Sequence, residues 1–91
     1  MGIRWAASAA KHGIEQADAM NAIANYVYRV PAFDEPRVPG GIRPDLFIGP
    51  NRDRTQLLEV MADITPPADI FVFHVMVARR KNLDIAEKGS K

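Results

Sequence analysis

The sequence predicts an α+β domain in which two N-terminal helices pack on one face of a three- to four-stranded antiparallel sheet. Three observations lead to this prediction. Apolar residues recur at helical spacing within the first 25 residues, later segments alternate between apolar and polar residues, and polar turns separate those segments. Helices followed by strands that tight turns connect are typical of this class.

The composition indicates one globular domain, residues 1–91. Its 47% hydrophobic and 25% charged residues are ordinary values for a folded protein. The absence of cysteine excludes a disulfide framework, thiol catalysis and cysteine-bound zinc. We see no signal peptide and no apolar run of about 20 residues, so we expect a cytoplasmic protein without membrane contact. A net charge of +1 argues against a strongly electrostatic nucleic-acid binder.

The N-terminal quarter predicts both helices. Residues 4–12 are rich in alanine and contain no helix breaker, and Gly13 stands where a left-handed cap residue would end a helix. Residues 15–25 are expected to form the second helix. Its apolar stripe consists of Ala17, Met20, Ile23 and Ala24.

The next segments predict strands. Residues 26–33 are β-branched and aromatic, and Pro31 favours an edge position for that strand. Residues 34–42 concentrate Pro, Gly and charge, which predicts a mobile loop. Residues 43–49 and 55–64 are expected to pair as a hairpin. In the second of these strands one side carries Leu58, Val60 and Ala62, and the other carries Leu57, Glu59, Met61 and Asp63.

Residues 70–77 form the most apolar segment and are expected to be the central strand. Simple alternation assigns Val72, His74 and Met76 to one face. The basic residues 79–81 would lead into a last turn of helix around Leu83 and Ile85, and residues 88–91 are expected to be a frayed tail.

Three short patches carry a family resemblance. Lys11-His12-Gly13 ends the first predicted helix, residues 47–60 give a strand, a turn and a strand, and residues 74–80 (HVMVARR) end the last strand. In this order and spacing they resemble the BrnT-type toxins, a branch of the RelE/ParE-like group, over roughly residues 3–86. The sequence departs from the family pattern at Val77, where Ser is usual, and at His74, which lies near an Arg position of the family.

The resemblance implies a RelE-like fold, RNA cleavage that needs no metal or other cofactor, and neutralisation by a cognate antitoxin encoded beside the toxin in bacteria. Such cleavage requires a base, an acid and a cation for the phosphorane. The residues expected to perform the chemistry are Glu59, His74 and Arg79, and those expected to bind RNA are Lys11, His12, Arg80 and Lys81. We expect Glu59 and His74 to project from the sheet face opposite the two helices.

Each candidate also has a structural interpretation. Glu59 is equally consistent with a solvent-facing residue on a half-exposed sheet, and His74 with a partly buried core histidine. His12 would complement the C-terminus of a helix as a cation. The basic residues 79–81 would suit a phosphate, an antitoxin or plain solvation. Trp5 is expected in the core rather than as a platform for bases.

Three functions therefore stay open on the sequence alone. The chain would be a toxin ribonuclease, a non-catalytic module of the same fold that binds an antitoxin-like partner without turnover, or a small-ligand or structural domain. Val72 and Met76, assigned to the face of His74, predict an apolar surface that an antitoxin or a second copy of the chain covers as a homodimer.

Overall fold

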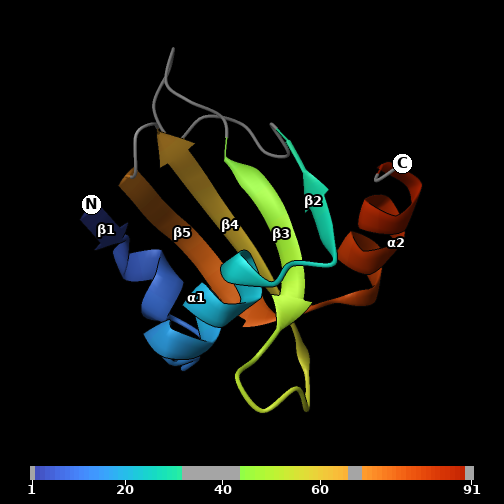
Figure 1. Ribbon diagram of the computed structural model, residues 1–91, viewed down its shortest axis with the longest axis horizontal. Coiled ribbons are helices and arrows are strands. Elements are labelled where there is room, and N and C mark those ends of the chain that lie inside the picture. Colours follow the sequence, from blue (N-terminus) through green and yellow to red (C-terminus); the bar gives the residue numbers. More distant parts are fainter. Residues whose placement is uncertain (1, 32–43, 66–68, 90–91) are drawn as a thin grey trace.

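The computed structural model describes residues 2–31, 44–65 and 69–89 (Figure 1). Five strands form one sheet in the order β1-β5-β4-β3-β2. The elements in chain order are β1 (Gly2–Trp5), the 3₁₀ helix η1 (Ala7–Ala10), α1 (Gln16–Ala24), β2 (Tyr28–Val30), β3 (Asp45–Pro50), β4 (Leu57–Thr65), β5 (Asp69–Val77) and α2 (Arg80–Gly89).

The sheet is mixed, which corrects the antiparallel sheet of three or four strands. β1 runs parallel to β5, with Ile3 opposite Ile70 and Trp5 opposite Val72, while the other neighbours are antiparallel. The helix predicted over 4–12 is wrong, because these residues give β1 and the single turn η1. Pairing with the otherwise open edge of β5 satisfies backbone groups at Gly2–Trp5, and this outweighs the weak helix preference of alanine.

The prediction of two N-terminal helices is also wrong. One α-helix, α1, precedes the strands β2 to β5, and the second, α2, follows β5 at the C-terminal end. Arg80 and Lys81 of the basic segment begin a ten-residue helix that ends at Gly89, so the helix includes residues 88–89 of the expected tail; residues 90–91 lie outside the described residues. Buried Asn82 and Ala86 lie one helical turn apart and define the face of α2 that meets the sheet.

The predicted strands over 43–49, 55–64 and 70–77 agree with β3, β4 and β5 to within two residues. β2 occupies an edge, as Pro31 suggested, but the middle strand is β4 and not β5. The predicted loop over 34–42 lies outside the described residues, as do residues 66–68 of the second predicted turn.

Side chains from the two faces of the sheet form two separate cores. The face toward α1 carries Phe47, Leu58, Val60 and Ala62, which pack with Ala19, Ala22 and Ile23 of the helix and with partly buried Trp5. The face toward α2 carries Leu46, Ile48 and Met61, which pack with Ala86 and partly buried Leu83. The helices thus cover opposite faces of one sheet (Figure 1).

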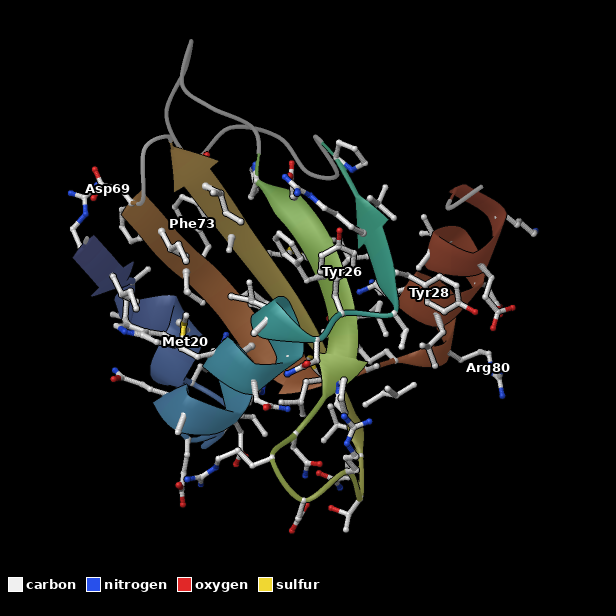
Figure 2. The ribbon with its side chains drawn as sticks, in the orientation of Figure 1. Met20, Tyr26, Tyr28, Asp69, Phe73 and Arg80 are labelled. Carbon is white, nitrogen blue, oxygen red and sulfur yellow. The ribbon has the colours of Figure 1, made fainter. Side chains whose placement is uncertain are left out.

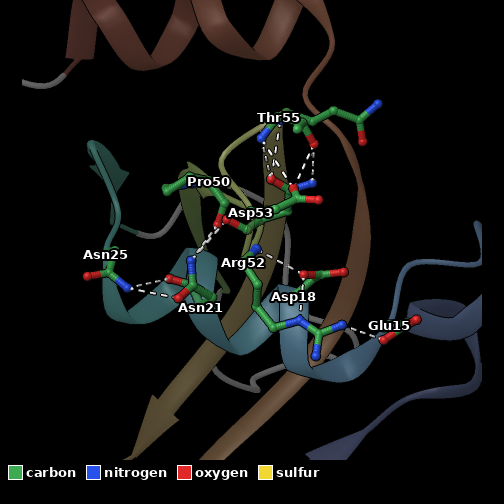
Figure 3. Close-up of polar contacts among 10 residues, drawn as sticks. Glu15, Asp18, Asn21, Asn25, Pro50, Arg52, Asp53 and Thr55 are labelled. Carbon is green, nitrogen blue, oxygen red and sulfur yellow. Dashed lines mark hydrogen bonds and ion pairs between the residues drawn. The ribbon is translucent and has the colours of Figure 1, made fainter.

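α1 approaches β3 closely at Gly49. A Cβ atom at this position would overlap the backbone carbonyl oxygen of Ala22, so only glycine permits this approach. Polar contacts lock the same junction (Figure 3). The side-chain amide of Asn21 donates to the carbonyl oxygens of Pro50 (3.0 Å) and Asn51 (3.2 Å), and Arg52 pairs with Asp18 and Glu15.

A β-bulge changes the side-chain alternation in β5. Val60 lies opposite Val75 and Met61 opposite His74, but Ala62 lies opposite Val72, so the register shifts by one residue. Val72 and Val75 both belong to the core under α1, although they are three residues apart. Phe73 and His74 between them therefore both face the other side. The prediction of an apolar surface is wrong for Val72, which is fully buried on the α1 side, whereas half-buried Met76 lies opposite Glu59 on the face of His74.

Candidate functional site

A buried carboxylate forms the centre of the candidate site. Glu59 lies in the middle strand β4, on the face opposite α1, and its side chain is 0% exposed. It accepts hydrogen bonds from His74 on β5, from Arg79 after β5, and from Asn82 on α2. The interpretation of Glu59 as a solvent-facing residue is therefore wrong. The expectation that Glu59 and His74 share a face opposite both helices is also wrong, because this face is opposite α1 only and α2 covers Glu59 there.

These donors keep Glu59 ionised. Burial alone would raise the pKa of Glu59, but hydrogen bonds from His74, Arg79 and Asn82 outweigh it and lower the pKa from 4.5 to about 2. At neutral pH the carboxylate is an acceptor only, and it is a very weak base. Glu59 can orient its neighbours and compensate their charge, and its oxygens are withdrawn from solvent.

The orientation of His74 follows from this charge. Its Nε2 lies 2.8 Å from Oε2 of Glu59. Because an ionised carboxylate has no proton to donate, Nε2 must carry the hydrogen of this bond. In neutral His74 the lone pair then resides on Nδ1. The His74 side chain is 17% exposed and hydrogen-bonded, which agrees with the structural interpretation of a partly buried histidine.

His12 joins the site from the opposite end of the sequence. It lies in the turn after η1, is exposed, and places its ring edge-on to the ring of His74, with 5.6 Å between the ring centroids and 76° between the planes. η1 packs beside β5 where β1 has ended, and this position brings residues 11–13 to the β5 edge. The two histidines of the chain are thus neighbours, 62 positions apart in sequence.

Arg79 binds Glu59 through both its main chain and its side chain. The backbone N–H donates to Oε1 at 2.9 Å, and Nη2 of the guanidinium donates to Oε2 at 2.7 Å. The guanidinium is 39% exposed, so its outer edge faces solvent beside His74. Asn82 completes the arrangement with a bond of 2.9 Å from Nδ2 to Oε2, which fixes the first turn of α2 over the carboxylate.

The predicted site residues divide into two groups. Glu59, His74, Arg79 and His12 come together, whereas Lys11, Arg80 and Lys81 are exposed and make no hydrogen bond to Glu59 or His74. Lys11 adjoins His12 in the same turn. Arg80 projects from the outer side of α2 (Figure 2) and lies 3.9 Å from Asp84.

Sequence reasoning missed Asn82, a fully engaged buried amide in a segment that looked like a solvated basic end. It lies on the face of α2 that packs on the sheet, and the hydrophobic spacing of Leu83 and Ala86 was the available signal. In the described ranges, no group of three or more His, Asp or Glu side chains is arranged to hold a metal ion.

Comparison with known proteins identifies no relative: no family model, no curated protein and no solved structure matches the chain. Among the described residues, no helix is long and apolar enough to cross a membrane.

Proposed function

We propose that the chain is a metal-independent ribonuclease of the toxin type, in which His74 and His12 transfer protons. The observation that carries this proposal is the bond between ionised Glu59 and Nε2 of His74, which leaves Nδ1 of His74 as a proton acceptor beside a second imidazole. An oriented imidazole next to another proton carrier meets the basic requirement of acid–base catalysis.

The reaction needs no other participant than RNA. Nδ1 of His74 takes the proton of a 2′-hydroxyl, and the 2′-oxygen attacks the adjacent phosphorus. The bond from phosphorus to the 5′-oxygen breaks, and protonated His12 gives its proton to that oxygen. The products are a 2′,3′-cyclic phosphate and a 5′-hydroxyl. Because His12 is exposed, its ring can rotate to admit the phosphodiester.

The cations near the two imidazoles would stabilise the phosphorane. The outer edge of the Arg79 guanidinium is exposed, and Lys11 adjoins His12. A preorganised cation aimed at developing charge is often the largest single contribution to catalysis. Arg80 and Lys81, the exposed residues that follow Arg79 at the start of α2, would then contact more distant phosphates.

In this proposal the protein acts in the cytoplasm, and a cognate antitoxin binds over the histidines. The exposed ring of His12 and the partly exposed guanidinium of Arg79 are accessible to such a partner. An acidic segment would compete directly with RNA for the same cations.

Cleavage of single-stranded RNA by the purified protein in a metal chelator tests the proposal. Wild type, His74→Ala and His12→Ala would be compared with Arg29→Ala, a matched control on edge strand β2. We expect each histidine variant to lose about 10²- to 10⁴-fold in rate, with the control unchanged. Cleavage that requires a divalent metal, or that survives both histidine substitutions, would reject the proposal.

Both carboxylate oxygens of Glu59 already accept hydrogen bonds from the protein. This favours a second candidate function, a binding module without turnover. Two partners of the carboxylate, Arg79 and Asn82, also fix α2 on the sheet, which is sufficient reason for a buried carboxylate. In that case the purified protein would bind its partner but leave RNA intact under every condition above.

A further inference from the structure

The same sheet face carries a stack of side chains beside His74. The rings of Phe71 and Phe73 stack with 4.6 Å between their centroids and 23° between their planes. The guanidinium carbon of Arg4, on the neighbouring strand β1, lies over the Phe71 ring at 4.9 Å from its centroid. Since Phe73 occupies one side of the Phe71 ring, Arg4 must cover the other side.

The bulge in β5 makes this stack continuous with the candidate site. Without it, residues 73 and 74 would point to opposite faces of the sheet. With it, Phe73 and His74 are adjacent residues on one face, and Phe71 shares that face two residues earlier. Bulges often redirect side chains next to functional sites. An aromatic platform therefore lies directly beside the proposed proton acceptor.

Arg4 and Phe71 are the accessible members of the stack. Arg4 is exposed and Phe71 is half-buried, whereas Phe73 lies deeper, at 8% exposure, and supports the Phe71 ring. The contact between Arg4 and Phe71 indicates that this ring face accepts a flat group. A planar base can replace the guanidinium there, and the displaced Arg4 can then pair with a phosphate.

We propose that the face of Phe71 now covered by Arg4 is a stacking subsite for one unpaired base of a single-stranded RNA. This inference rests on the proposed function and names its substrate class. Stacked bases within a duplex cannot reach such a platform, whereas unpaired bases can stack on aromatic rings and on arginine. Arg4 borders the Phe71 ring, Lys11 adjoins His12, and Arg79 shares the carboxylate of Glu59 with His74, so cations are available to phosphates on either side of a stacked base.

The test measures binding rather than cleavage. The probe is a fluorescent single-stranded oligonucleotide with 2′-O-methyl riboses, which cannot be cleaved by attack of the 2′-oxygen. Fluorescence anisotropy gives the Kd for wild type, for Phe71→Leu, which removes the aromatic face but keeps an apolar side chain, and for Phe71→Trp. Tyr26→Leu is the matched control, because Tyr26 is an exposed aromatic residue that packs on Phe47 of the α1-side core.

We expect Phe71→Leu to weaken binding by roughly 5- to 150-fold, the range for losing one stacked base. Phe71→Trp should bind at least as well as wild type, and Tyr26→Leu should match it. Duplex RNA should bind more weakly and be insensitive to Phe71→Leu. Equal affinity of wild type and Phe71→Leu for the single strand would overturn the inference.

A change in the ligand keeps the test decisive if Phe71→Leu does not fold. In a series of oligonucleotides, each lacks the base of one nucleotide but keeps every phosphate. The oligonucleotide whose missing base would stack on Phe71 should bind the wild-type protein more weakly than the others. If none does, the subsite does not exist. RNA binding that depends on Phe71 without any cleavage would sustain the subsite and reject the ribonuclease. If cleavage requires His74 but Phe71→Leu changes neither Kd nor KM, the ribonuclease proposal stands and the stacking subsite is rejected.

Discussion

Arg79 holds Glu59 twice, through its backbone N–H at 2.9 Å and its guanidinium at 2.7 Å. The two contacts join the end of β5 and the start of α2 to the middle strand through one buried charge. His74 and Asn82 share the same carboxylate. A change at Glu59 should therefore affect both the orientation of the proposed catalytic histidine and the attachment of α2.

Acid should destabilise the protein through Glu59. Its pKa is about 2 in the folded protein against 4.5 when unperturbed, so the unfolded chain binds more protons between these values. The stabilisation, about 3 kcal/mol from that difference, is fully present above pH 4.5 and is lost as the pH falls toward 2. Urea unfolding at pH 7, 4 and 2.5 measures it. Glu59→Gln should flatten the pH dependence; a variant as acid-sensitive as wild type would contradict this assignment.

Glu59→Gln should also be less stable than wild type at pH 7. The amide keeps one acceptor oxygen but loses the negative charge, and its NH2 group would face the N–H donors of His74, Arg79 and Asn82 if it took the place of Oε2. Breaking one partner of a buried charged network costs about 3–5 kcal/mol. Asp53→Asn, at an exposed turn residue, is the control with the same chemical change. Equal unfolding free energies for the two variants would show that Glu59 does not hold this network together.

The tautomer of His74 is a direct readout of its orientation. When the imidazole of His74 in the wild-type protein is neutral, its ring hydrogen should be on Nε2. ¹⁵N NMR of the imidazole nitrogens distinguishes this tautomer from the one with the hydrogen on Nδ1. In Glu59→Gln the bond to an ionised acceptor is lost, and a mixture of tautomers is expected. A wild-type spectrum with the hydrogen on Nδ1 would remove the proposed proton acceptor.

Lysine should not replace Arg79. The guanidinium contacts both carboxylate oxygens of Glu59, and an ammonium group cannot reproduce that planar arrangement. Because the guanidinium is partly exposed, we expect Arg79→Ala to lose roughly 2 kcal/mol of stability, with less than half restored in Arg79→Lys. The backbone bond to Glu59 persists in both variants. Thermal unfolding of wild type, Arg79→Lys and Arg79→Ala gives their order of stability. A melting temperature of Arg79→Lys equal to that of wild type would contradict this prediction.

Gly49→Ala should disturb the packing of α1 against β3 without changing the arrangement of His12 and His74. The new methyl group would overlap the Ala22 carbonyl, and overpacking of this kind costs about 1–3 kcal/mol. Gly13→Ala is the informative comparison. Its Cβ meets open space, but a φ of +71° strains any other residue by about 1 kcal/mol. Chemical denaturation should rank Gly49→Ala as the more destabilising; the reverse order would show that α1 can shift away from β3.

The hairpin strands and α1 were predictable because each carries its pattern locally. Leu58, Val60 and Ala62 alternate as expected, and they lie on the side that α1 covers. The bulge was not predictable in this way, since Val72 and Phe73 look like any alternating pair. Only the pairing with β4, where Ala62 meets Val72, reveals the shift.

Long-range pairing also explains the errors at the chain ends. Gly2–Trp5 has no strand pattern of its own and becomes β1 only because β5 has an edge to fill. The burial of Glu59 similarly depends on three donors that lie 15, 20 and 23 residues further along the chain. Glu59, His74 and Arg79 could be named from the sequence as candidates, but their hydrogen-bonded arrangement could not.

The parallel pairing of the first strand with the last has a consequence for synthesis. As the chain leaves the ribosome, Gly2–Trp5 emerges before Asp69–Val72 and has no partner strand until those residues follow. The contact between His12 and His74 has the same delay, and Asn82 emerges later still. Loop closure over such a separation is slow compared with helix formation. A chain that does not yet include β5 thus lacks the assembled pair of imidazoles.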